Sequence, residues 1–315
     1  MNICIFGVGG VGGYFGTLIT RRFSAEHAIH FIARGSHKDA IMANGLILKK
    51  EAGEKVFTVH PTSCTDTTSG LPVCDIIILS VKSYDLPGAV ETIRPITGEQ
   101  TVILPLLNGV DIYDRIRTTL ATGMVLPACV YVGTYIEQPG VIFQKGGNCR
   151  ICLGADPNHP DSTPEALLSL LRECNIDFSW EEDVRIAIWS KFIFIAAYGL
   201  VTATYDVTLG GILEDKQLSI TTLSIMTEIV TIARKLSIPL PPESAATAFE
   251  KAKLFPYDAK TSFQRDVKAK GSINEADLFG GTIIRYGKEL SVPVPVTESV
   301  YNNLIDTLKR KNTVG

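Results

Sequence analysis

Near its start the chain reads Asn2-Ile3-Cys4-Ile5-Phe6-Gly7-Val8-Gly9-Gly10-Val11-Gly12. A short apolar strand leads into a run of glycines, and a helical pattern follows directly, which is the context of a dinucleotide-binding fingerprint. Gly7 permits a tight turn, Gly9 lets a pyrophosphate approach the backbone, and Gly12 lets the helix pack close to the strand. The whole run from Gly7 to Gly12, including Val8, Gly10 and Val11, is therefore predicted to bind a dinucleotide. A purely structural glycine turn is the alternative.

The first half of the chain alternates short strand-like runs with helical patterns, as expected for a parallel sheet built from βαβ units. The predicted strands cover residues 2–6, 28–33, 75–81 and 101–107, and the predicted helices cover 12–23, 38–44, 86–93 and 110–120. From 124 to 154 strand segments alternate with turns, which predicts an antiparallel extension. We therefore expect an α/β domain of the Rossmann type, with a doubly wound sheet.

Beyond about residue 181 the strand patterns end and helical patterns follow one another. The predicted helices cover residues 184–203, 218–236, 244–253, 262–270, 275–289 and 297–309. A chain of 315 residues is long enough for two hydrophobic cores. The sequence therefore predicts a dinucleotide-binding domain over residues 1–181 and an all-α domain over residues 182–315.

The overall composition excludes several classes of partner. Lys plus Arg total 30 against 33 Asp plus Glu, so the chain has no positive surplus with which to bind nucleic acid. The seven cysteines are scattered, which favours a reducing cytoplasm and predicts no metal site. Cys149 and Cys152 have CxxC spacing, but they lie in a predicted strand with no second pair nearby in the sequence. Glycines break the N-terminal apolar run, so we expect no signal peptide and no membrane anchor there.

The residue that follows the second predicted strand distinguishes the two nicotinamide cofactors. A carboxylate at this position binds the adenosine ribose 2′-hydroxyl, but this chain has Arg34. A guanidinium pairs well with a 2′-phosphate, so NADPH is the expected cofactor. An exposed arginine that merely begins a loop is the alternative. Lys82 and Asn108 follow the next two strands and are expected to face the same crevice, although Asn-Gly is also ordinary turn sequence.

Lys191 is the only charged residue in the stretch 186–203, which is apolar on every face. The stretch approaches the length of a membrane span, but Ser190 and Lys191 in its interior favour a buried core helix. Burial disfavours the charged form of a lysine and lowers its pKa unless a carboxylate compensates. Lys191 is thus a candidate proton donor. The alternative is a lysine whose long side chain extends to solvent.

Histidine is a poor candidate for the proton donor, because all five histidines fall in the first half and none follows a predicted strand at the crevice. Lys191 therefore leads, and Glu275 is its plausible carboxylate partner. Asn274 and Glu275 open a predicted helix. An N-cap at Asn274, with Glu275 favouring the helix dipole, explains these two residues equally well.

In this order the residues resemble the ketopantoate reductase (2-dehydropantoate 2-reductase) family over nearly the whole chain. The resemblance rests on the Gly7, Gly9 and Gly12 loop, Arg34, Ser80-Val81-Lys82, Asn108-Gly109, Gln138-Pro139-Gly140, Trp189-Ser190-Lys191, Ser262 before Asp266, and Glu275-Ala276-Asp277 with Gly281. It implies a helical domain like that of 6-phosphogluconate dehydrogenase and an active site in the cleft between the domains. It also implies NADPH-dependent reduction of 2-dehydropantoate to pantoate, on the route to pantothenate and coenzyme A.

The resemblance further implies a role for each matching residue. Lys191 is the general acid that protonates the carbonyl oxygen, and Asn108 and Glu275 hold it. Ser262 binds the carboxylate of the substrate, and Lys82 lies near the nicotinamide ribose. Asn108 is accordingly predicted to contact substrate and cofactor as well as the acid.

Three positions depart from the family pattern, and one of them is Gln144, where a histidine is common after the Pro-Gly turn. The family usually carries asparagines four and eight residues after the catalytic lysine, where they contact the distal hydroxyl of the substrate, but this chain has Ile195 and Gly199. The loss removes hydrogen bonds worth about 1–3 kcal/mol. An NADPH-dependent reductase of another branched 2-oxo acid and a non-catalytic NADPH-binding sensor are therefore alternative functions. The sequence leaves open whether the protein is a monomer or a homodimer.

Overall fold

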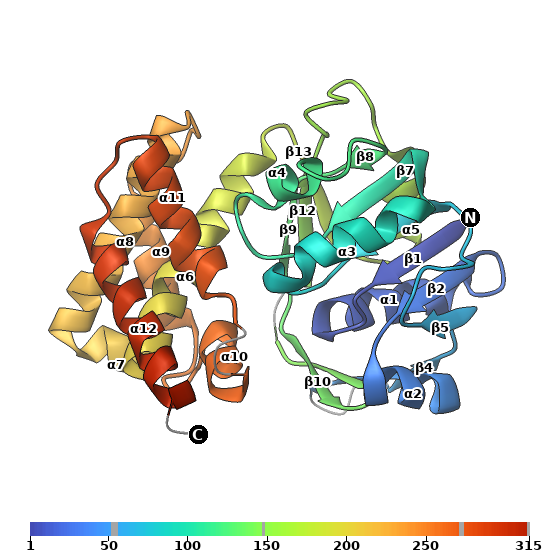
Figure 1. Ribbon diagram of the computed structural model, residues 1–315, viewed down its shortest axis with the longest axis horizontal. Coiled ribbons are helices and arrows are strands. Elements are labelled where there is room, and N and C mark those ends of the chain that lie inside the picture. The colour runs from blue at the N-terminus through green and yellow to red at the C-terminus, as the bar shows by residue number, and fades with distance from the viewer. Residues whose placement is uncertain (52–55, 147–148, 271–273, 314–315) are drawn as a thin grey trace. The chain divides into compact units, whose positions relative to one another are not determined.

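The chain folds into two compact units, Met1–Val184 and Arg185–Gly315, in this computed structural model (Figure 1). The structure describes residues 1–51, 56–146, 149–270 and 274–313. Sheets occur in the first unit, whereas the described residues of the second unit form helices and no strand. This confirms the predicted α/β domain followed by an all-α domain.

A six-stranded parallel sheet forms the centre of the first unit. Its strands are β1 (Asn2–Phe6), β2 (Ala28–Ile32), β5 (Ser63–Thr65), β6 (Cys74–Leu79), β7 (Thr97–Pro105) and β8 (Met124–Val125). They lie in the order β5-β2-β1-β6-β7-β8, and every neighbouring pair is parallel. Counted along the chain, this is the order 3-2-1-4-5-6 of dinucleotide-binding sheets. The order reverses between β1 and β6, and ligands of such sheets bind at that point.

The central strands are apolar on both faces because helices cover the parallel sheet. Ile3 and Ile5 of β1 and Ile76 to Ile78 of β6 have no exposed surface. The helices are α1 (Gly10–Phe23), α2 (Gly35–Asn44), α3 (Leu86–Ile93), α4 (Ile112–Arg117) and α5 (Glu165–Glu173). Figure 1 shows α3 in front of the sheet. Helix α3 has the predicted bounds, whereas α1 and α2 begin slightly earlier than predicted. Helix α5 was not predicted.

Two smaller sheets complete the first unit. The first has the order β10-β11-β3-β4 and the second the order β13-β12-β9. Their strands are β3 (Leu46–Lys50), β4 (Phe57–Val59), β9 (Ala128–Tyr131), β10 (Thr134–Gln138), β11 (Val141–Gln144), β12 (Arg150–Gly154) and β13 (Phe178–Glu181). The predicted antiparallel extension is only part of this arrangement, because β11 pairs in parallel with β3 and β12 in parallel with β13. Both parallel partners come from outside the segment 124–154.

The second unit is a set of packed helices. They are α6 (Val184–Tyr205), α7 (Leu209–Glu214), α8 (Lys216–Lys235), α9 (Ser244–Glu250), α10 (Ser262–Lys270), α11 (Thr282–Glu289) and α12 (Pro295–Thr313). The single helix predicted over 275–289 instead begins with a π-helical turn, Asp277–Gly281, that precedes α11. A side chain at Gly280 would clash with the ring of Tyr301, so this turn packs tightly against α12.

Helix α6 is long and apolar enough to cross a membrane by length and composition. Within its apolar 18-residue stretch, 61% is buried inside the protein. Leu200 and Val201 have no exposed surface, and the Tyr198 hydroxyl donates a hydrogen bond to the carbonyl oxygen of Phe249 at 2.8 Å. Helix α6 is therefore the core helix of the second unit, as predicted.

Candidate functional site

The glycine loop between β1 and α1 is fixed by contacts that a side chain would prevent. Gly7 has φ +92°, and its amide and that of Val8 donate to the carbonyl oxygen of Ile32 at 3.1 and 3.2 Å. A Cβ on Gly7 would lie 2.8 Å from the carbonyl oxygen of Ser80. A Cβ on Gly12 would lie 2.2 Å from the carbonyl oxygen of Gly7. The loop is thus held tightly against the ends of β2 and β6.

Gly9 differs from its neighbours because the space above it is open. No atom of the described residues lies within 4 Å of a Cβ built there. Gly9 is also the N-cap of α1, and the first turn, Gly10 to Gly13, contains no acidic residue. The first amides of a helix have no partner within the helix and carry the positive end of its dipole. This open, positive helix start fits a phosphate group.

The remaining predicted loop residues support the loop from behind. Val8 is 3% exposed and Val11 packs against the core of the unit. A Cβ on Gly10 would lie 2.7 Å from the carbonyl oxygen of Thr134 in β10. Strand β10 thus packs directly against the start of α1. Any contact of Val8, Gly10 or Val11 with a phosphate is therefore made by the backbone.

Arg34 follows β2 and is the N-cap residue of α2. Its side chain is 67% exposed, and its Nη1 atom lies 3.8 Å from Oδ1 of Asp85, whose side chain is 40% exposed. An ion pair this long and this exposed contributes little to stability. The guanidinium thus lies at the end of β2 with most of its surface open to a ligand.

His37, in the first turns of α2, is a residue that sequence reasoning missed. Its Nδ1 atom accepts a hydrogen bond from the amide of Gly140 at 3.0 Å. Burial lowers the pKa of His37, although the backbone of Val8 opposes this lowering. A neutral imidazole therefore joins α2 to the turn between β10 and β11 and lies beside the glycine loop. Its partners are far away in sequence, so no local pattern indicates the contact.

Lys82 and Asn108 follow the neighbouring strands β6 and β7, and both are half-buried. The strand ends are joined there, because the amide of Leu106 donates to the carbonyl oxygen of Leu79 at 2.8 Å. Gly109, next to Asn108, has φ +122° and so requires glycine. The strand order places β1, β6 and β7 side by side. The glycine loop, Lys82 and Asn108 therefore share one edge of the sheet, at its point of reversed order.

In the second unit, Lys191 lies in α6 between two buried aromatic residues. Lys191 is half-buried, whereas Trp189 and Phe192 are 4% and 1% exposed. The ring of Trp189 packs against those of Phe192 and Tyr286, with centroids 6.2 and 5.9 Å away. This packing fixes the turn of α6 that carries the lysine. The stretch 186–203 was predicted to be fully buried, but Lys191 is only half-buried.

Glu275 is a buried carboxylate, with 4% of its surface exposed. It precedes the π-helical turn, and the amide of Ala276 donates to Oδ1 of Asn274 at 2.8 Å. This contact is a local turn before the π-helical segment, whose N-cap is Ala276 and not Asn274 as one of the two interpretations predicted. A buried carboxylate is stable in its charged form only with a positive or hydrogen-bonding partner.

Ile195 and Gly199 follow Lys191 at intervals of one helical turn, so the three residues share one face of α6. A Cβ on Gly199 would lie 3.5 Å from Cδ1 of Phe263, a residue that is 1% exposed. The first turn of α10 therefore packs against α6, and exposed Ser262 lies directly before Phe263. Phe263 was not among the predicted residues. The face beyond Lys191 is apolar at Ile195 and closed by an aromatic ring at Gly199.

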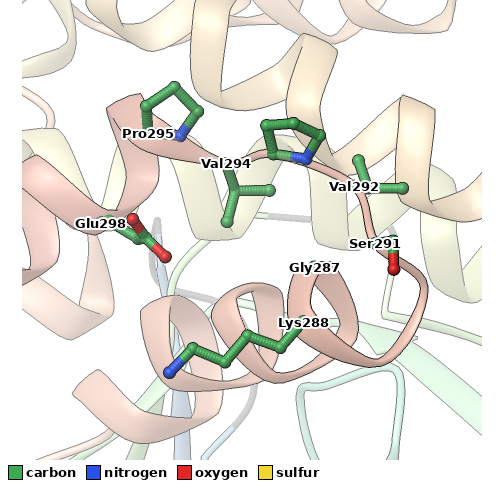
Figure 2. Close-up of a pocket in the computed structure, with 8 residues that line it drawn as sticks. Gly287, Lys288, Ser291, Val292, Val294, Pro295 and Glu298 are labelled. Carbon is green, nitrogen blue, oxygen red and sulfur yellow. The ribbon is translucent and has the colours of Figure 1, made fainter.

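A surface pocket of about 420 Å³ lies where α11 leads into α12, and Figure 2 shows its lining. The lining is mostly apolar, from Val292, Val294 and Pro295, with Lys288 and Glu298 at the rim. It contains none of the predicted site residues. Among the described residues there is also no group of three or more His, Cys, Asp or Glu that would hold a metal ion.

Two family models match the chain, one in each half. The family model "Ketopantoate reductase PanE/ApbA" matches residues 3–158, and "Ketopantoate reductase PanE/ApbA C terminal" matches residues 183–307. The chain is 27% identical over 304 residues to "Uncharacterized oxidoreductase YkpB" of Bacillus subtilis (strain 168), which covers 96% of this chain and 98% of that protein.

Two further proteins are similar over nearly the whole chain. The 2-dehydropantoate 2-reductase of Aquifex aeolicus (strain VF5) is 28% identical over 308 residues, which cover 95% of this chain and 94% of that protein. A ternary structure of D-mandelate dehydrogenase with NADH and anilino(oxo)acetate has a TM-score of 0.86 and 20% identity, and covers 99% of this chain and 100% of that one. At this identity the likeness shows a shared fold.

Proposed function

The chain belongs to the ketopantoate reductase family, whose two models match both of its halves, and we propose that it is an NADPH-dependent 2-dehydropantoate 2-reductase. It is an oxidoreductase of that family that uses a nicotinamide cofactor. The observation that carries the proposal is the presence on one chain of an open glycine loop and a half-buried lysine in an apolar helix. The glycine loop can bind the phosphates of the cofactor, and the lysine can act as the proton donor.

The glycine loop binds the pyrophosphate in this proposal. The open space above Gly9 admits the phosphates, and the first amides of α1 donate to their oxygens. Arg34 pairs with the 2′-phosphate, because its guanidinium is largely exposed at the end of β2. Lys82 and Asn108 bind the nicotinamide half, since they lie at the same edge of the sheet. When bound, NADPH supplies the hydride for the reduction.

Lys191 donates the proton to the carbonyl oxygen of the substrate. As charge develops on that oxygen, the ammonium group stabilises it and then transfers a proton. Glu275 holds Lys191 in place, which also gives the buried carboxylate a positive partner. Ser262, exposed at the start of α10, binds the carboxylate of the 2-oxo acid.

Lys191→Ala tests this assignment. Purified protein is expected to oxidise NADPH when 2-dehydropantoate is added, and Lys191→Ala is expected to reduce kcat by roughly 10²–10⁴-fold, the usual contribution of a general acid. The affinity for NADPH remains unchanged. Lys288→Ala is the matched control, since Lys288 is an exposed lysine of the same unit outside the proposed site. Full turnover by Lys191→Ala would remove the mechanism.

A second function within the same chemistry is the reduction of a branched 2-oxo acid without a distal hydroxyl. Ile195 offers no hydrogen bond, and the contact of Gly199 with the ring of Phe263 makes the neighbouring surface apolar. A higher kcat/KM for 2-oxoisovalerate than for 2-dehydropantoate would favour this function. Ile195→Asn then provides the complementary test, because it is expected to shift the ratio toward 2-dehydropantoate.

The setting of the reaction follows from the same proposal. An enzyme with small soluble substrates and with cysteines that form no disulfide is expected in the reducing cytoplasm. It needs a small-molecule 2-oxo acid, and neither nucleic acid nor a membrane is a partner. Size-exclusion chromatography with light scattering decides between monomer and homodimer.

A further inference from the structure

Cys129 and Cys152 lie opposite each other in the antiparallel pairing of β9 with β12. Side chains at directly opposite positions of antiparallel strands project from the same face, with Cβ atoms about 4.5–5.5 Å apart. The two side chains are therefore neighbours on one face of the sheet, although the residues are far apart in sequence.

The pair lies on the outer face of its sheet. Because side chains alternate along a strand, Tyr131 and Arg150 share the face of the two cysteines. Both are exposed, and Tyr131, 37% exposed, hydrogen-bonds Cys129. The opposite face supplies the core of the unit through Val130, Ile151 and Leu153. The two cysteines, 3% and 7% exposed, thus lie just beneath the exposed side chains of their own strands.

The environment of Cys152 favours its thiolate. The hydrogen bond from Cys129 lowers the pKa of Cys152 to about 6, although burial raises it. Glu181 raises the pKa further and Arg150 lowers it, both by smaller effects. Since the thiolate is the reactive form of cysteine, Cys152 is a nucleophile near neutral pH. Cys129 lies opposite it on β9.

The CxxC spacing of Cys149 and Cys152 does not describe this pair. Cys149 has φ +48° and packs against the core. Its side chain therefore belongs to the interior, whereas that of Cys152 belongs to the outer face. The contact partner of Cys152 comes from the neighbouring strand.

We propose that Cys129 and Cys152 form a thiol modification site that hydrogen peroxide converts to a cross-strand disulfide. The Cys152 thiolate attacks one peroxide oxygen, the O–O bond breaks, and the departing hydroxide takes up a proton to leave as water. The sulfur of Cys129 then attacks the sulfenic sulfur of Cys152, so that the S–S bond forms, the S–O bond breaks and a second water leaves. Two thiols are oxidised by two electrons, and peroxide is reduced to two waters. A dithiol reverses the change.

Peptide mapping of the full-length protein tests this proposal. After brief exposure to hydrogen peroxide, alkylation of the remaining thiols and trypsin digestion, the expected product links peptide 118–145, which contains Cys129, to peptide 151–172, which contains Cys152. Cys149 falls in the separate peptide 146–150, so a link to Cys149 is distinguishable and would overturn the proposal. Dithiothreitol is expected to abolish the link. Failure to recover any linked peptide would also overturn it.

Three variants define the roles of the cysteines. Cys129→Ala is expected to leave a sulfenic acid at Cys152 that dimedone traps, and to slow the reaction with peroxide at least about tenfold near pH 6, because alanine has no hydrogen-bond donor for the thiolate. Cys152→Ser is expected to abolish the reaction. Cys149→Ser is the control and keeps the link. Loss of the link in Cys149→Ser would contradict the assignment.

Cys4 and Cys74 provide an internal control within the same chain. Their thiols also form a hydrogen bond, but Cys4 has no exposed surface and Cys74 is 2% exposed. The interaction with Cys74 and then burial raise the pKa of Cys4, whereas the pKa of Cys74 is lowered. This pair therefore differs from Cys129 and Cys152 in its position inside the central sheet, on β1 and β6, where peroxide has no access. Both residues are expected to remain reduced while Cys129 and Cys152 react. Oxidation of the two pairs at equal rates would overturn the proposal, because it would indicate unfolding.

Discussion

Gly12 packs so closely against Gly7 that a Cβ at position 12 would lie 2.2 Å from the Gly7 carbonyl oxygen, whereas a Cβ at Gly9 would meet open space among the described residues. The two positions separate the structural and the ligand-binding roles of the loop. We expect Gly12→Ala to lower the free energy of unfolding by about 1–3 kcal/mol, as overpacking does. Urea denaturation monitored by circular dichroism measures this change.

Gly9→Ala is expected to have the opposite profile. Its free energy of unfolding stays within about 0.5 kcal/mol of the parent value, since the added methyl group touches nothing in the protein. Its affinity for NADPH falls, because the methyl group occupies the space proposed for the pyrophosphate. Isothermal titration calorimetry measures the affinity for NADPH. Urea denaturation of the same variant shows whether it is folded as stably as the parent. Unchanged NADPH binding would place the phosphates elsewhere.

Arg34→Ala tests the preference for NADPH. A charged hydrogen bond to a phosphate contributes about 1.5–3 kcal/mol, so the Kd for NADPH is expected to rise roughly ten- to a hundredfold while that for NADH changes little. Asp85→Asn is the matched control, because it removes the carboxylate 3.8 Å from the guanidinium and leaves Arg34 in place. If Arg34→Ala raises the Kd for NADPH and the Kd for NADH by the same factor, Arg34 does not contact the 2′-phosphate.

Asp156 connects three segments of the first unit through a fully buried carboxylate. It accepts hydrogen bonds from the Tyr113 hydroxyl at 2.8 Å, the Val125 amide at 2.9 Å and the His159 ring at 3.0 Å, and it forms an ion pair with Arg117. Burial raises the pKa of Asp156, but hydrogen bonds led by that of His159 outweigh it, and the pKa is lowered overall.

This lowered pKa predicts a loss of stability in acid. The carboxylate binds its proton more weakly in the folded than in the unfolded chain, so its contribution is full above the unfolded pKa of about 3.9 and is lost as the pH falls through the folded pKa. Asp156→Ala is expected to cost about 3–5 kcal/mol at neutral pH, because Arg117 is left buried without its partner. Urea denaturation as a function of pH measures both effects. If the difference in the free energy of unfolding between the parent and Asp156→Ala is the same in acid as at neutral pH, the lowered pKa of Asp156 does not stabilise the folded protein.

Gly199→Ala tests how closely α10 packs on α6. Alanine favours a helix interior over glycine by about 0.5–1 kcal/mol, and its Cβ would make an ordinary contact, 3.5 Å from the Phe263 ring. We therefore expect the free energy of unfolding to rise by about that amount. Gly199→Asn is the control, since its longer side chain displaces the ring and cancels the gain. Destabilisation by alanine would indicate that the helices lie closer than described.

Local patterns predict the parts of the fold that depend on local chemistry. The strand Asn2–Phe6 and the helices Leu86–Ile93 and Ser262–Lys270 have the predicted bounds because each combines an apolar pattern with clear ends. The short strands β3, β5 and β13 were missed. Their partners, β11, β2 and β12, lie elsewhere in the chain, so a run of three to five residues carries little pattern of its own.

The candidate site shows the same division. The tight turn at Gly7 and the close packing at Gly12 were predicted, because both requirements impose a spacing within one loop. The phosphate contact at Gly9 stays a prediction. His37 and Phe263 were not predicted, since each acts through a contact with a residue about 60 or more positions away, Gly140 or Gly199. Cys152 was paired in sequence with Cys149, but the fold pairs it with Cys129.

The close approach of Gly10 to the Thr134 carbonyl in β10 has a consequence for biosynthesis. Although the glycine loop leaves the ribosome first, the strands that pack behind α1 emerge about 120 residues later. β11 must also insert beside β3 before that support is complete. A nascent chain halted before residue 134 therefore lacks the backing of its own loop, and we expect it to be released from an NADPH-mimetic affinity resin that retains the finished protein.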